Sequence, residues 1–124
     1  MRKIVQFQHT TYENGALYLH TDQADLLDGA SAAGQIIADS DQYAFVYLAE
    51  KEDEYIYLYL DESLWPQLKT ALSDKAAVIA KGGENKLELD SFTDELDYLV
   101  DNIEGNGNYG DEMVKKVESV FLGK

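Results

Sequence analysis

The spacing of hydrophobic residues changes near residue 60, from alternation with polar residues to a four-residue repeat. Short alternating runs bounded by turn residues are typical of β-strands. We expect strands over residues 3–10, 16–21, 36–37, 43–49 and 55–60. Glu13-Asn14-Gly15 and the charged segment 51–54 are expected to form hairpin turns. Residues 23–34 are ambiguous, with a short strand at Leu26-Leu27 as one option and a loop of small residues over 29–34.

Three helices are expected in the second half of the chain. Leucines recur every four residues from Leu64, which predicts the first of these helices. Asp61 or Ser63 is expected to cap this helix, and Pro66 fits its first turn. A second hairpin, with strands over 76–80 and 86–89, precedes helices over 91–104 and 111–122. Ser91 and Asp94 resemble a capping box, and Gly105 is a natural helix stop.

Short turns favour antiparallel pairing, so the order of elements predicts an α+β fold. We expect one domain over residues 1–124, with a single antiparallel sheet of about six or seven strands. Three helices, two of them C-terminal, would cover a face or an edge of that sheet.

The two histidines, His9 and His20, test the register of the first hairpin. A two-residue Asn14-Gly15 turn would place them directly opposite each other, as two ligands of a metal site. A three-residue loop instead gathers four apolar side chains on one face: Val5, Phe7, Leu17 and Leu19. Because register follows the buried face, we prefer the longer loop, which separates the histidines and predicts no metal site.

The two aromatic strands over 43–49 and 55–60 are the most informative feature of the sequence. If Ala49 pairs with Tyr55, the rings share one face of the sheet and the aliphatic side chains share the other. The candidate binding residues on that face are five tyrosines: Tyr43, Tyr47, Tyr55, Tyr57 and Tyr59. Such a face either packs under a helix or serves as an interface, where tyrosine is enriched.

Composition excludes several classes of protein. Hydrophobic residues make up 45% of the 124 residues, which argues against general disorder. The absence of cysteine excludes disulfides, thiolate nucleophiles and cysteine metal clusters. There is no long apolar run and no signal-peptide pattern at the start, so we expect a cytoplasmic protein without a membrane span.

The charge is strongly negative. Ten Lys and Arg face 24 Asp and Glu, which gives a net charge of −14. This balance argues against direct binding to nucleic acid or to an anionic membrane, since both depend on basic side chains. A negative field attracts basic partners, so an acidic inhibitor or nucleic-acid mimic of a basic protein is an alternative function.

Residues 105–110 match G-x-G-x-x-G, but a helix precedes them and Asp111 and Glu112 follow. Those carboxylates would repel a phosphate, so we interpret the segment as a connection between helices. The wider stretch ELDYLVDNIEGNGNYGDEMVKKVESVFL, residues 95–122, resembles the YjbL-like family of small Bacillus-type bacterial proteins. The resemblance extends upstream through Asp39-Ser40-Asp41 and Trp65, and it implies a bacterial cytoplasmic protein without an assigned activity.

The resemblance directs attention to the segment 102–110 as a second candidate region. Its candidate binding residues are Asn102, Asn106, Asn108 and Tyr109. No serine lies in G-x-S-x-G and no catalytic residues are indicated. We therefore expect a non-enzymatic module that uses the tyrosine face to bind another protein, with a basic protein as one candidate and no cofactor. A small-molecule binder or enzyme built around 102–112 is a further alternative, and the oligomeric state is left open.

Overall fold

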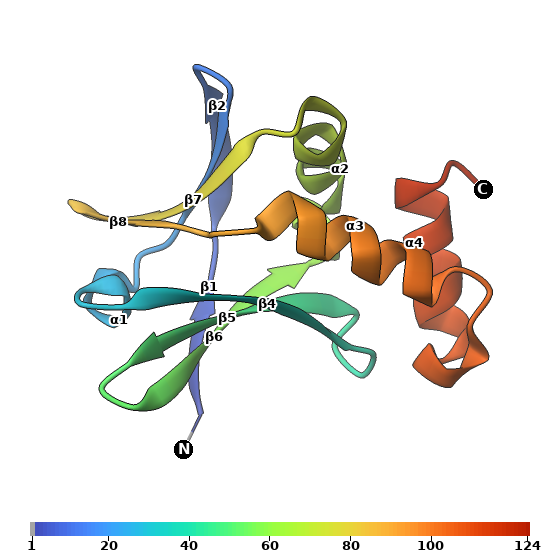
Figure 1. The fold of residues 1–124 in the computed structure, drawn as a ribbon, viewed down its shortest axis with the longest axis horizontal. Coiled ribbons are helices and arrows are strands. Elements are labelled where there is room, and N and C mark those ends of the chain that lie inside the picture. Colours follow the sequence, from blue (N-terminus) through green and yellow to red (C-terminus); the bar gives the residue numbers. More distant parts are fainter. Residues whose placement is uncertain (1) are drawn as a thin grey trace.

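The structure is a computed structural model that describes residues 2–124, and it contains two four-stranded sheets with four α-helices (Figure 1). Sheet A consists, in spatial order, of β1 (Lys3–Gln6), β6 (Glu54–Asp61), β5 (Ala44–Lys51) and β4 (Ser31–Asp39). Sheet B consists of β2 (His9–Glu13), β3 (Ala16–His20), β7 (Ala77–Gly82) and β8 (Asn85–Glu88). The helices are α1 (Ala24–Leu27), α2 (Trp65–Asp74), α3 (Phe92–Ile103) and α4 (Asp111–Phe121).

The prediction of a single antiparallel sheet with three helices is wrong. Each sheet contains one parallel pair, β1 with β6 and β3 with β7, and the other pairs are antiparallel. The expected strand over 3–10 is interrupted at Phe7 and Gln8, where the chain passes from sheet A to sheet B. Figure 1 shows β1 and β2 following each other along one line through both sheets. The Gln8 amide donates to the carbonyl of His20 at 2.8 Å, which fixes this passage.

The register of the first hairpin also differs from the preferred prediction. Asn14 and Gly15 both have positive φ, 51° and 78°, and form a two-residue turn that pairs Glu13 with Ala16. The preferred longer loop is therefore wrong, and His9 lies directly opposite His20. Val5 belongs to the other sheet, so its burial sets no register in this hairpin.

The core lies between the sheets and helices α2, α3 and α4. On sheet A, the Phe45 ring contacts Trp65 of α2 and Phe121 of α4, with ring centroids 5.1 and 5.7 Å apart. The buried Trp65 indole donates its N–H to the carbonyl of Leu60 at 3.0 Å. Sheet B adds four buried side chains to the same core: Leu17, Leu19, Val78 and Ala80. The helices therefore cover the inner face of sheet A, the face that carries Phe45.

Local signals predicted the helices better than their ends. The three expected helices form as α2, α3 and α4, and the expected hairpins form as β5–β6 and β7–β8. Asp61 accepts a hydrogen bond from the Ser63 amide at the short 3₁₀ turn that precedes α2. Ser91 has a φ of 60° and makes no side-chain capping bond, so the capping-box prediction is wrong.

Among residues 2–124, none of the helices is both long and apolar enough to cross a membrane.

Candidate functional site

The β5–β6 hairpin divides the predicted tyrosine face between two sides of sheet A. Ala49 pairs with Ile56 rather than with Tyr55, so each side chain of β6 lies on the side opposite to the expected one. Tyr47 shares the inner face with Leu58, whereas Tyr57 shares the outer face with Leu48. The expectation of one face with all the rings is therefore wrong, and only the β6 tyrosines lie together on the outer face.

Tyr47 is part of the core. Its side chain is completely buried and stacks on Phe92 of α3, with ring centroids 5.9 Å apart. Its hydroxyl donates to the carbonyl of Asp90 at 2.7 Å and accepts from the Gly34 amide at 3.2 Å. Burial raises the pKa of Tyr47 to about 12. This hydroxyl ties β4 to the start of α3 and is not accessible to a partner.

Tyr43 is also separate from the β6 tyrosines. It precedes β5 with a φ of 50°, and its half-buried ring packs against the core. The ammonium of Lys116, on α4, lies 4.9 Å from the centre of this ring. The contact is a cation–π interaction that joins the β4–β5 turn to the last helix.

The outer face of sheet A, called here the aromatic face, has a buried floor and exposed rings above it. Its members are Ile4, Ile37, Val46, Leu48, Tyr55, Tyr57 and Tyr59. Val46 and Leu48 are only 1% and 6% exposed although they point away from the core. Tyr55, Ile37 and Ile4 are 48%, 39% and 37% exposed, and they are three of the five exposed large hydrophobic residues described. Exposed apolar residues gathered on one face are typical of interaction surfaces.

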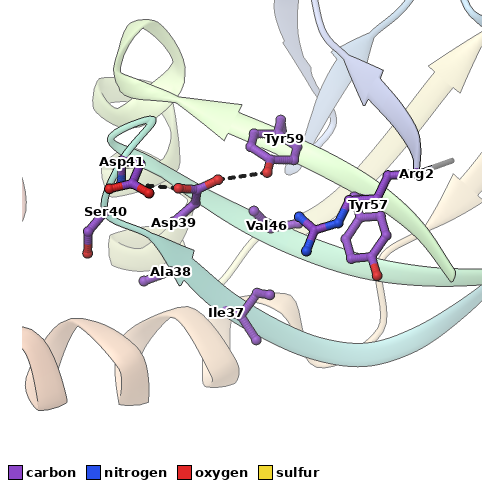
Figure 2. A pocket seen from close by; sticks show the side chains of 9 residues that line it. All are labelled: Arg2, Ile37, Ala38, Asp39, Ser40, Asp41, Val46, Tyr57 and Tyr59. Atoms are coloured by element: carbon purple, nitrogen blue, oxygen red, sulfur yellow. Dashed lines mark hydrogen bonds between the residues drawn. The ribbon is translucent and has the colours of Figure 1, made fainter. Parts of the chain in front are cut away.

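A hollow of about 400 Å³ opens on the aromatic face between β4, β5 and β6, with Arg2 on one side (Figure 2). The Tyr59 hydroxyl donates to Asp39 Oδ2 at 2.7 Å. Asp39 Oδ1 accepts from the amides of Asp41 and Gln42, both at 3.1 Å. The hydrogen bond to Asp39 is the main cause that raises the pKa of Tyr59, followed by burial. A carboxylate held by three donors gives the hollow a fixed acidic wall.

A cationic side chain already occupies part of the aromatic face. The Arg2 guanidinium lies 4.9 Å from the centre of the Tyr57 ring, as Figure 2 shows. Lys3 and Glu54 form an exposed ion pair at 2.9 Å, but the register places both residues on the other side of sheet A. A second hollow of about 230 Å³ at the other end of the face is lined by Glu50, Asp53, Glu54 and Tyr55. The aromatic face is therefore suited to bind cations above its rings and at both of its acidic ends.

The segment 102–110 connects α3 to α4, as the interpretation of its glycines proposed. Gly105 and Gly110 have positive φ, 66° and 90°. The Asn106 side chain donates to the carbonyl of Asn102 at 3.2 Å and accepts from the Asn108 amide at 3.0 Å. Tyr109 packs against the core. These four candidate residues are brought together, but their described contacts hold the loop itself in shape.

The outer face of sheet B carries residues that sequence reasoning missed. The rings of His9 and His20 stack with centroids 4.3 Å apart and planes 4° from parallel. Register places Lys81 next to His20, and Lys86 next to Lys81. The Asn14-Gly15 dipeptide was the signal for this arrangement, because it is the strongest short-range hairpin signal. Within residues 2–124, no group of three or more His, Asp or Glu is placed to hold a metal ion.

Three members of the hollow on the aromatic face were also missed. Ile37 and Asp39 belong to β4, a nine-residue strand that the sequence indicated only at residues 36–37. Alternation of Ile37 and Asp39 with the buried Ile36 was the signal that could have placed them on the outer face. Nothing in the local sequence pointed to Arg2, which reaches the hollow only because β1 pairs with β6.

Comparison with known proteins identifies relatives over almost the whole chain. Residues 5–121 match the model of a family of unknown function, UPF0738. The chain belongs to this family. A UPF0738 protein of Bacillus velezensis is 40% identical over 124 residues, which cover 98% of this chain and 100% of that protein. The UPF0738 protein YjbL of Bacillus subtilis is 44% identical over 90 residues, 73% of this chain and 74% of YjbL.

The family relationship also extends beyond Bacillus. A UPF0738 protein of Geobacillus kaustophilus is 40% identical over 111 residues, which cover 89% of each chain. The resemblance to YjbL-like proteins is thus confirmed. No solved structure matches the chain.

Proposed function

We propose that this UPF0738 protein is a non-enzymatic, cytoplasmic interaction module that binds a basic protein segment on the aromatic face of sheet A. The observation that carries the proposal is the gathering of Ile4, Ile37 and Tyr55, all more than a third exposed, over a buried floor. Helices α2, α3 and α4 pack on the opposite side, where Phe45 and Tyr47 contact them. The aromatic face is therefore open to a partner.

The chemistry of the face supports a partner with Arg or Lys next to apolar residues. Arg2 lies on the Tyr57 ring, so the face already holds one guanidinium–ring contact of the kind that we propose for the partner. Asp39 and Asp41 line the hollow at one end, and three further acids line the hollow at Tyr55. A basic segment would place its apolar side chains on the exposed rings and its cations at these ends.

A second copy of the same chain is a poorer occupant. Each copy carries a net charge of −14, and the ends of the aromatic face are acidic. Pairing two such faces would bring like charges together, which costs free energy unless salt screens them. Charge complementarity therefore supports a basic protein over a homodimer.

The test compares two exposed tyrosines on different surfaces. A photo-crosslinking residue is placed at Tyr55 on β6 or, as the matched control, at Tyr98 on α3, which is 68% exposed. In a Bacillus host we expect a basic protein to be captured from position 55 and not from position 98. The captured protein is then purified, and its affinity for the wild type, Tyr55→Ser and Tyr98→Ser is measured directly.

We expect Tyr55→Ser to weaken binding about tenfold or more, as for an aromatic interface anchor, and Tyr98→Ser to leave it unchanged. Binding should also weaken as salt increases, because part of it is electrostatic. Equal capture from both positions, or an affinity that Tyr55→Ser does not change, would contradict the proposal. Circular dichroism of both variants verifies that each remains folded.

A further inference from the structure

The outer face of sheet B gathers basic side chains in an otherwise acidic protein. Cross-strand register aligns four of them, one from each strand: His9, His20, Lys81 and Lys86. Neighbouring strands are about 4.8 Å apart, so adjacent members of this basic row are close enough to bind one compact anion together. The row cannot be recognised in the sequence, because its two halves come from hairpins about sixty residues apart.

A hollow of about 340 Å³ adjoins three members of the row, His9, His20 and Lys81. It is lined by Gln8, His9, His20, Thr21, Asp22, Lys81 and Gly83. Lys81 is half-buried in this hollow, and within residues 2–124 it forms no ion pair with a carboxylate. By contrast, Lys3, Lys116 and Lys124 each have an acidic partner. A lysine that lines a hollow without a carboxylate in an ion pair with it is available to an anionic ligand.

The histidines add donors that depend on pH. His20 Nε2 and the Thr11 hydroxyl are 2.8 Å apart, so Thr11 occupies one ring nitrogen and the other is left to bind a ligand. The charges that face His20 are His9 and Lys81, which oppose its protonation, and Glu13, which favours it. Burial is the largest cause that lowers the pKa of His20. An anion beside these groups would counter the repulsion between them.

We propose that the basic row binds a compact oxyanion of the phosphate class, and that binding is coupled to protonation of His20. The net charge of −14 does not exclude this, because fields from distant carboxylates are screened beyond about 8 Å at physiological ionic strength. Within the hollow, Asp22 is the one carboxylate among the lining residues. Asp22 therefore opposes the anion locally, and its removal should strengthen binding.

The experiment is an NMR titration of the full chain with inorganic phosphate, against chloride at the same ionic strength. We expect saturable shifts at the amides of Lys81 and Gly83 and at the rings of both histidines. Phosphate should raise the pKa of His20, and binding should strengthen as the pH falls, because the two equilibria are linked.

Substitutions at two residues of the hollow should change the affinity for phosphate in opposite directions. Lys81→Gln should weaken phosphate binding at least about tenfold, the value of one charge-assisted hydrogen bond, and Asp22→Asn should strengthen it. Lys69→Gln, an exposed lysine on α2, is the matched control and should change nothing. Because Lys81 is half-buried, the exposed His9→Gln provides a second variant that should also weaken binding.

Two results would overturn the proposal. The first is a wild-type titration without saturable shifts in the hollow. The second is equal loss of binding in Lys81→Gln and Lys69→Gln, which would indicate a general charge effect rather than a site. Spectra of each variant without phosphate establish that the fold is retained.

Discussion

The outer faces of the two sheets differ in how far their hydrophobic side chains are buried and in which charges surround them. On sheet A, Tyr57, Tyr59 and Ile37 cover an almost fully buried floor, and carboxylates lie at both ends of the face. On sheet B, the half-buried Ile79 pairs with Tyr18 and Glu88, and the same face carries the stacked histidines and two lysines. The comparison teaches that net charge does not describe the surface, because the few bases are not spread evenly.

The strongest test of this difference places a carboxylate on each outer face. Val46→Asp would bury an unpaired charge on sheet A, so we expect a loss of at least about 3 kcal/mol in the free energy of unfolding. Ile79→Asp on sheet B lies at a half-buried position, and we expect a loss of about 1 kcal/mol or less. Chemical denaturation measures both, and equal losses would remove the distinction between the two faces.

A smaller difference in the free energy of unfolding is expected between variants on the two sides of the β5–β6 hairpin. Tyr47→Phe leaves the carbonyl of Asp90 and the amide of Gly34 without their shared hydroxyl partner. We expect it to lower the free energy of unfolding by about 1–3 kcal/mol. The control Tyr55→Phe, at a ring that is 48% exposed, should change it by less than about 0.5 kcal/mol.

This pair of variants also tests whether the Tyr47 hydroxyl, unlike the tyrosines of the aromatic face, has a structural role. If Tyr47→Phe proved neutral in urea denaturation, the inner hydroxyl would have no structural role. The Tyr47 ring would still be completely buried against Phe92, so it would remain outside the aromatic face. With either result, Tyr55, Tyr57 and Tyr59 are the tyrosines of the aromatic face.

The smallest expected effect is a pH dependence that belongs to sheet B alone. Burial, His9 and Lys81 lower the pKa of His20 in the folded protein, so the unfolded chain takes up the proton first as the pH falls. The contribution of His20 to stability is complete above the ordinary histidine pKa of about 6.5 and decreases below it. Thermal unfolding in chloride should therefore show a steeper loss for the wild type than for His20→Gln between about pH 7.5 and 5.5. Parallel curves for the two proteins would contradict this assignment.

Sequence reasoning succeeded where structure is local. The leucine repeat of α2, the apolar stripes of α3 and α4, and the hairpin β7–β8 all follow from neighbouring residues. The division into two sheets does not, because it depends on parallel pairs between distant segments. At Phe7 and Gln8, where the chain changes sheet, there is no proline or glycine to indicate a break.

The candidate site was predicted in part for a related reason. Three of the five tyrosines lie on the aromatic face, and Tyr47 was misplaced by a shift of one residue in the register. The β5–β6 turn holds Glu52 and Asp53 at positive φ, 53° and 65°, without a glycine that would indicate it. A one-residue shift moves every side chain of a strand to the other face, so this turn alone determined the error.

The passage of the first strands through both sheets has a consequence for protein synthesis. Lys3 pairs with Ile56 and Ala16 pairs with Ala77, so each early strand needs a partner more than fifty residues further along. A ribosome adds about 5–20 residues per second, so these partners are made seconds after β1 and β3. The hairpin of β2 and β3 can close at once, but β1 remains without its neighbour during that interval. Strand β1 is therefore synthesised well before the strand that holds it in place.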